Sequence, residues 1–155
     1  MDWAYEKAVD GAPGLDSARD LANNYLASDK NLIKQVESLI RSQKRKTARH
    51  GILTGLGGIV TIPHTITSVI FIQVRMIAAI AHMGGYDLQD DHVKTLVKRC
   101  LITNMVTKRV FNRVKFVPLI GVLIGSTVDA IVTNTIGYSA KNTFIKTNTH
   151  SKKRR

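Results

Sequence analysis

Five polar side chains stand out because they lie in the two least charged parts of the chain. They are His64, Ser68, Arg75, His82 and Asp129. Arg75 is the only Asp, Glu, Lys or Arg between residues 51 and 83, and Asp129 is the only one between residues 116 and 140. At about 100° per residue, the first four side chains fall within a narrow arc of one helix face. Imidazole, hydroxyl, guanidinium and carboxylate groups can move protons or bind a small polar molecule, so these five residues are the catalytic candidates.

A lone arginine and a lone aspartate in two apolar segments predict an ion pair between two helices. We expect Arg75 and Asp129 to meet and to fix the register of the helices that carry them. The same polar stripe could instead line a pocket for a small ligand or substrate. Both interpretations remain open at the level of the sequence.

Metal and cofactor chemistry has little support in the sequence. His64 and His82 share a helix face but lie about 27 Å apart along it, at about 1.5 Å per residue. His82, Asp87, Asp91 and His92 form a conceivable ligand set across Gly84-Gly85. The chain has no His-Glu-x-x-His, no Walker or Rossmann phosphate loop and no Gly-x-Ser-x-Gly. We therefore expect no metal and no cofactor, and we leave enzymatic activity open while leaning against it.

The single cysteine, Cys100, excludes an intramolecular disulfide. It lies in a segment that is expected to be helical. The simplest interpretation is a small buried or half-buried side chain, because no partner motif for redox or nucleophilic chemistry accompanies it.

Charge is the most unusual property of the composition. The chain has 23 Lys and Arg against 11 Asp and Glu, a net charge of +12. Residues 1–40 hold seven acids and four bases, a net of −3, so residues 41–155 carry +15. This asymmetry favours an anionic partner. The basic residues expected to bind an anionic surface are Arg41, Lys44, Arg45, Lys46, Arg49, Lys152, Lys153, Arg154 and Arg155, and the stretch Lys108–Lys115 is a further basic run.

Hydrophobic periodicity predicts an all-α fold, a compact bundle of about five to six helices with two central Gly-rich apolar helices. Helices are expected from Leu15 to Leu26, from a cap at Ser28 with Asp29 in the first turn, and from about Pro63 to Met83. A further helix should follow Asp87–Asp91, and the last should lie within 116–140. We expect residues 1–146 to form one domain and residues 147–155 to form a basic flexible tail.

The apolar segments are long enough to cross a bilayer, but their composition argues against it. Residues 51–74 contain four Thr, one Ser, one His and one Pro, with Arg75 directly after them. Asp129 lies within the second segment, where a charge in lipid costs roughly 3 kcal/mol or more. Charges among the first ten residues argue against a secretory signal. We favour a cytoplasmic bundle that is soluble or peripheral to the membrane, with integral insertion as the alternative.

Four stretches together resemble the EcsC family of bacterial proteins. They are Asp-Trp-Ala-Tyr-Glu-Lys-Ala (2–8) with Pro13-Gly14-Leu15, Thr-Gly-Leu-Gly-Gly (54–58) with Pro63, Gln-Val-Arg-Met-Ile-Ala-Ala-Ile-Ala (73–81) with Gly-Gly-Tyr-Asp (84–87), and Val-Pro-Leu-Ile-Gly (117–121) with Gly125, Asp129 and Ile136-Gly137. The segment before Val117 is shorter here than is general in the family. The resemblance implies a bacterial protein related to one encoded beside an ATP-binding-cassette transporter, without an established activity.

Three functions follow, in order of preference. The first is a non-catalytic bundle held by its basic clusters at an anionic membrane surface, or at a membrane protein there. The second is a hydrolase-like enzyme that uses the polar stripe. The third is charge-driven nucleic-acid binding, and we expect no specific nucleic-acid partner because most of the nine aromatic residues lie outside the basic runs.

Overall fold

The computed structural model describes residues 2–11, 16–54, 68–111 and 130–145. Side chains are described in the same ranges, except at 49–54, 68 and 104–111. These residues form six helical segments and no strand, which confirms the all-α prediction.

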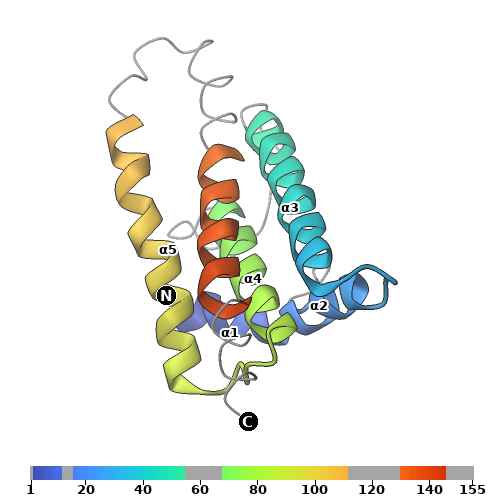
Figure 1. The fold of residues 1–155 in the computed structure, drawn as a ribbon. Coiled ribbons are helices and arrows are strands. Elements are labelled where there is room, and N and C mark those ends of the chain that lie inside the picture. Colours follow the sequence, from blue (N-terminus) through green and yellow to red (C-terminus); the bar gives the residue numbers. More distant parts are fainter. Residues whose placement is uncertain (1, 12–15, 55–67, 112–129, 146–155) are drawn as a thin grey trace.

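Two short helices begin the chain and lie across one end of the longer ones (Figure 1). α1 (Asp2–Asp10) buries Tyr5 and Val9 on its inner face. α2 (Ala18–Leu26) is capped by Ser17 and begins after it rather than at Leu15 as expected, because Ser17 and Asp20 form a capping box. The Ser17 hydroxyl accepts from the Asp20 amide at 3.0 Å, and the Asp20 carboxylate accepts from the Ser17 amide at 3.3 Å.

α3 (Leu32–Thr54) is a long helix that carries the first basic cluster. The prediction of a cap at Ser28 and a first turn at Asp29 was wrong. The Ser28 hydroxyl donates instead to the Tyr25 carbonyl at the end of α2, and residues 28–30 form a bend. Asn31 caps α3, because its side-chain oxygen accepts from the Lys34 amide at 2.9 Å.

α4 (Ser68–Met83) is the central helix, and every residue from Phe71 to Ala81 is buried. It contacts α1, α2, α3, α5 and the C-terminal helical segment, so it has no solvent-facing side over these residues. The predicted end of this helix is confirmed. Tyr86 donates its amide to the Ala81 carbonyl and Gly85 donates to the His82 carbonyl, with φ of 82° at Gly85, a Schellman motif that needs the left-handed glycine.

α5 (Asp91–Phe111) and a C-terminal helical segment complete the bundle. Asp90 caps α5 by accepting from the His92 amide at 2.8 Å, close to the predicted start. The C-terminal segment is α-helical over 130–140 and ends in a π-helical turn, η2 (Lys141–Ile145). Figure 1 shows it in orange-red between α3 and α5, in front of α4. The described parts of the two apolar segments are therefore neighbours in the bundle.

Among the described residues, no helix is both long and apolar enough to cross a membrane.

Candidate functional site

A chain of hydrogen bonds joins three helices inside the bundle. The Gln73 side-chain amide of α4 donates to the Thr133 hydroxyl of the C-terminal segment at 3.0 Å. Thr133 donates to the Thr47 hydroxyl of α3 at 3.3 Å, and Thr47 donates to the Gln43 carbonyl at 2.9 Å. All four residues are buried, so these bonds fix the register of the three helices without a charge.

The Gln43 side chain is buried in this polar interior without forming a hydrogen bond of its own within the described part of the chain. It is 0% exposed, and its amide nitrogen and oxygen have no hydrogen-bond partner among the described residues. A buried amide without partners costs about 1–3 kcal/mol. Gln43 lies on the same buried side of α3 as Val36, Leu39 and Ile40, which are all 0% exposed.

Arg75, on another side of α4, contacts the chain just before α2. It is 3% exposed, and its Nη1 donates to the backbone carbonyl of Asp16, just before α2, at 3.0 Å. Its Nε has no partner among the described residues. Burial lowers the pKa of the guanidinium, and the negative charge of Asp16 opposes that effect. The polar interior thus has two separate parts on α4, with Gln73 bonded to the C-terminal segment and Arg75 bonded to Asp16, before α2.

Asp129, the predicted partner of Arg75, lies outside the described residues, so the ion pair stays a prediction. An Asp129→Ala variant should lose about 3–5 kcal/mol of unfolding free energy if the pair is buried, because it strands the guanidinium. Urea unfolding measures this change. Unaltered stability would leave the Asp16 carbonyl as the group that holds Arg75.

The other catalytic candidates are not assembled into a site by the described residues. His64 lies outside them, and Ser68 begins α4 with its side chain undescribed. His82 is half-buried in the last turn of α4, where Gly85 ends the helix. The conceivable metal set of His82, Asp87, Asp91 and His92 is not brought together. Among the described residues, no three His, Cys, Asp or Glu side chains are placed to hold a metal ion.

Cys100 is buried, as expected for a small side chain on the inner face of α5. Its thiol lies 3.7 Å from the hydroxyl of Thr143, which donates to the Ser139 carbonyl at 3.0 Å. The cysteine therefore packs α5 against the C-terminal segment.

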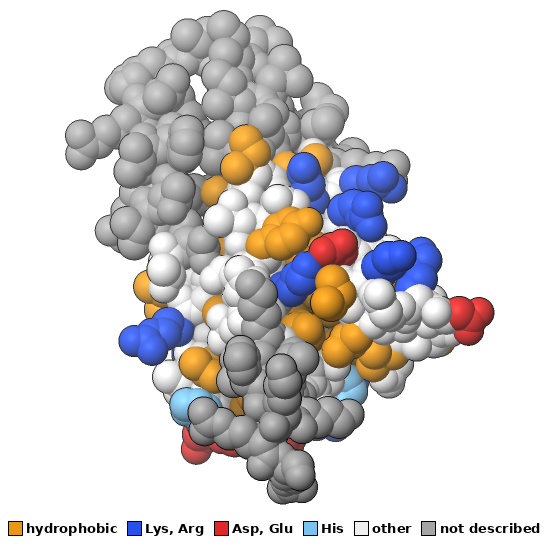
Figure 2. Space-filling model, viewed as in Figure 1, with side chains coloured by type: hydrophobic (Ala, Val, Ile, Leu, Met, Phe, Trp, Pro, Cys, Tyr) orange, Lys and Arg blue, Asp and Glu red, His pale blue; other side chains and the backbone are white. Residues whose placement is uncertain are grey.

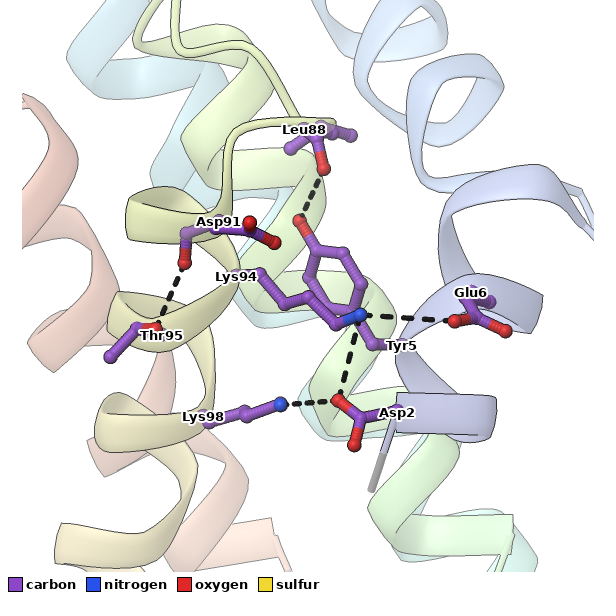
Figure 3. Close-up of polar contacts among 8 residues, drawn as sticks. All are labelled: Asp2, Tyr5, Glu6, Leu88, Asp91, Lys94, Thr95 and Lys98. Carbon is purple, nitrogen blue, oxygen red and sulfur yellow. Dashed lines mark hydrogen bonds and ion pairs between the residues drawn. The ribbon is translucent and has the colours of Figure 1, made fainter.

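Polar contacts also hold α1 against α5 (Figure 3). The Tyr5 hydroxyl donates to the Leu88 carbonyl at 2.8 Å, and Lys94 lies over the Tyr5 ring. Lys94 pairs with Asp2 at 3.5 Å and with Glu6 at 3.7 Å, and Lys98 also pairs with Asp2. The hydrogen bond and the charge of Lys98 hold the pKa of Asp2 below its usual value. These exposed pairs orient α1 but contribute little free energy.

The Tyr5 phenol has a strongly shifted pKa. Burial raises it to about 12, and the negative charge of Asp87 adds to the rise, while Arg19 opposes it. No role for this tyrosine follows from the sequence alone, because the Leu88 carbonyl that it contacts is 83 residues away.

The basic cluster of α3 forms a continuous exposed surface. Arg41, Lys44, Arg45 and Lys46 are all exposed, and Figure 2 shows Lys and Arg side chains gathered over α3. Arg49 belongs to α3, but its side chain is not described, and residues 152–155 lie outside the described part. The ion pairs of the described residues involve Lys94, Lys98 and Lys141, so none neutralises this surface. We call these four residues the basic face of α3.

A second group of side chains borders the basic face of α3. Lys141 pairs with Glu37 at 2.5 Å and lies 5.5 Å from the centre of the Tyr138 ring. The hydrogen bond and charge of Lys141 hold the pKa of the Glu37 carboxyl below its ordinary value. Tyr138 and Ile131, seven residues apart on the C-terminal segment, are 40% and 54% exposed. Their exposure has no signal in the sequence, because the whole segment is apolar and resembles the interior of a bundle.

A groove also runs between α2 and the basic face of α3. Its volume is about 450 Å³, and it is lined by Tyr25, Ser38, Arg41, Ser42, Arg45 and Lys46. The spacing of Arg41 and Arg45 by four residues could have indicated that they share a face, but the sequence does not say that Tyr25 lies opposite them.

No family model matches this chain, and no curated protein or solved structure is significantly similar to it. The resemblance to the EcsC family therefore stays a prediction that rests on the four sequence stretches.

Proposed function

We propose that this protein is a non-catalytic helical bundle that binds an anionic membrane surface, at its cytoplasmic side, through the basic face of α3. The observation that carries the proposal is the exposure of Arg41, Lys44, Arg45 and Lys46 on one helix without a carboxylate partner among the described residues. Membership of the EcsC family is part of the same proposal.

Electrostatic attraction contributes more to the proposed membrane binding than apolar contacts do. A Lys or Arg near an anionic membrane surface is worth about 1 kcal/mol, so the four residues together contribute several kcal/mol. This attraction falls off over the Debye length of about 10 Å at 0.1 M salt, so binding should weaken steeply as salt is added. Arg49, the stretch Lys108–Lys115 and the tail Lys152–Arg155 would add to it if they reach the same surface.

The exposed apolar side chains beside the basic face of α3 support the same orientation. Lys44 lies two turns after Glu37 on the same side of α3, and Lys141 joins Glu37 to Tyr138. Tyr138 and Ile131 therefore lie beside the cationic surface rather than on a remote face. Tyrosine suits the interface between headgroups and acyl chains, because its ring is apolar and its hydroxyl is polar.

The hydrolase-like alternative has no comparable support. Arg75, the candidate described in most detail, is buried and bound to a backbone carbonyl, and His82 is half-buried at a helix end. Nucleic-acid binding by charge shares the salt dependence of the membrane proposal, so the identity of the anion must separate the two.

The test is flotation of the purified protein with neutral and anionic vesicles at low and high salt. We expect binding to anionic vesicles alone and its loss at high salt. A triple variant, Lys44→Gln, Arg45→Gln and Lys46→Gln, should bind about a hundredfold more weakly, since it removes about 3 kcal/mol of attraction. The matched control removes three exposed charges elsewhere, with Lys7→Gln, Arg19→Gln and Arg99→Gln.

The outcomes separate the hypotheses. Equal weakening by both triple variants would show that net charge, not the basic face of α3, controls binding. If the folded protein binds neither kind of vesicle but binds single-stranded DNA, the membrane proposal is wrong and nucleic-acid binding is favoured.

A further inference from the structure

The groove between α2 and α3 is lined by hydrogen-bond donors. Of its six lining residues, three carry a positive charge and three carry a hydroxyl group. None is acidic and none is aliphatic. A concave surface with this composition selects an anion with several acceptor oxygens, whereas a flat basic patch selects only negative charge.

The spacing of residues on α3 produces this arrangement. Ser38, Arg41, Ser42 and Arg45 are three and four positions apart, so they form one stripe on the helix surface. The last turn of α2 places Tyr25 across from them. Two arginines four residues apart on a helix repel each other. An anion between them would relieve that repulsion.

The acidic residue next to this stripe is engaged elsewhere. Glu37 lies one turn before Arg41, where it could form a helical ion pair. Its carboxylate is instead 2.5 Å from Lys141 of η2. Arg41 acts on the Glu37 carboxyl through its charge, but none of the ion pairs of the described residues involves Arg41, Arg45 or Lys46, so the N–H donors of the groove stay available.

We propose that this groove binds the phosphate group of a phosphomonoester, with Arg41 and Arg45 as paired ligands of the phosphate oxygens. A guanidinium donates two parallel hydrogen bonds to phosphate, and Ser38, Ser42 and Tyr25 supply hydroxyl donors around it. A monoester presents three terminal oxygens and up to two negative charges, whereas a diester presents two oxygens and one charge. A volume of about 450 Å³ falls within the range of ligand pockets, so it admits the group attached to the phosphate as well.

A phosphomonoester can come from a lipid headgroup, such as phosphatidic acid, or from a soluble molecule. In the first case the inference rests on the proposed membrane function and gives it lipid selectivity. In the second case it stands without that function. The chemistry of the groove is the same in both, so the experiment must contain both kinds of probe.

The experiment compares two single variants with the same charge change. Arg45→Gln alters a residue that lines the groove, and Lys44→Gln alters its exposed neighbour, which does not line it. The probes are vesicles with phosphatidic acid, vesicles of equal surface charge with phosphatidylglycerol, and soluble glycerol 3-phosphate with dimethyl phosphate as the diester control. Vesicle binding is measured by flotation and soluble binding by calorimetry.

We expect wild-type protein to prefer each monoester to its diester counterpart. Arg45→Gln should weaken monoester binding by about tenfold or more, because it removes a charge-assisted contact. Lys44→Gln should weaken it by much less. On phosphatidylglycerol vesicles the two variants should be equivalent. Ser42 is half-buried, and Ser42→Ala removes a hydroxyl of the groove without changing its charge. This variant should reduce the monoester preference and leave diester vesicle binding intact.

Each contrary result has a distinct meaning. Equal effects of Arg45→Gln and Lys44→Gln on every probe would overturn the groove inference and leave the proposed membrane function standing. Arg45-dependent binding of glycerol 3-phosphate without vesicle binding would support the groove and reject the membrane function. Folded wild-type protein that binds none of the probes would overturn both.

Discussion

Replacing Tyr5 with phenylalanine removes one hydroxyl and keeps the packed ring. That hydroxyl donates to the Leu88 carbonyl at 2.8 Å, and both residues are buried. The variant leaves the carbonyl without this donor in a place that water reaches poorly. Because an unpaired buried polar group costs about 1–3 kcal/mol, Tyr5→Phe should lose that amount of unfolding free energy near neutral pH.

The pH dependence gives this prediction a second, independent readout. The pKa of Tyr5 is about 12 in the folded protein and about 10 in an unfolded chain. Between these values the unfolded chain releases a proton that the folded protein keeps, so wild-type stability falls as pH rises. The slope approaches about 1.4 kcal/mol per pH unit. The stabilising effect of the hydroxyl is therefore complete below pH 10 and is lost as pH rises toward 12.

Urea unfolding followed by circular dichroism measures both effects. The wild type should be more stable than Tyr5→Phe at pH 7, and the difference should shrink above pH 10. Tyr138→Phe is the matched control, because Tyr138 is 40% exposed and should show neither effect. A difference between wild type and Tyr5→Phe that is absent at pH 7, or constant from pH 7 to pH 11.5, would refute the reasoning.

Three further changes test the packing of the interior by thermal or urea unfolding. Gly137→Ala would place its Cβ 2.8 Å from two carbons of Ile40, so overpacking should cost about 1–3 kcal/mol, and an unchanged midpoint would contradict this close approach. Thr133→Val leaves the Gln73 amide without its acceptor and should cost about 1–3 kcal/mol; an unchanged midpoint would contradict the hydrogen-bond chain. Gln43→Met removes an unpaired buried amide and should stabilise by about 1 kcal/mol or more, whereas destabilisation would show that the amide has a partner.

The sequence predicted which segments are helical better than it predicted how the helices begin and which residues their side chains contact. Helical periodicity predicted the all-α class, and Gly84-Gly85 predicted where α4 ends, because a left-handed residue is a local requirement. The sequence-based prediction was wrong at the start of α3. Ser28 and Asn31 can both cap a helix, and the choice depends on how the chain turns after Tyr25.

The two polar residues of α4 show the same difference between what the sequence predicts and what packing decides. A helical wheel places Arg75 on one side of its helix and Gln73 on another, and the structure agrees with that separation. The sequence suggests a functional role for the Arg75 side alone, yet α4 is buried on every side from Phe71 to Ala81, so both polar groups need partners inside the protein. Only packing decided that Arg75 reaches the Asp16 carbonyl and that Gln73 reaches Thr133.

The basic surface combines what the sequence determined with what only the tertiary structure decided. The number and spacing of the charges on α3 are local properties, so the sequence alone predicts an exposed cationic face. The groove needs Tyr25 of α2 opposite that face, and the availability of Arg41 needs Lys141, 104 residues after Glu37, to engage Glu37. Contacts between residues so far apart in the chain have no local signal, because they form only when the helices pack together.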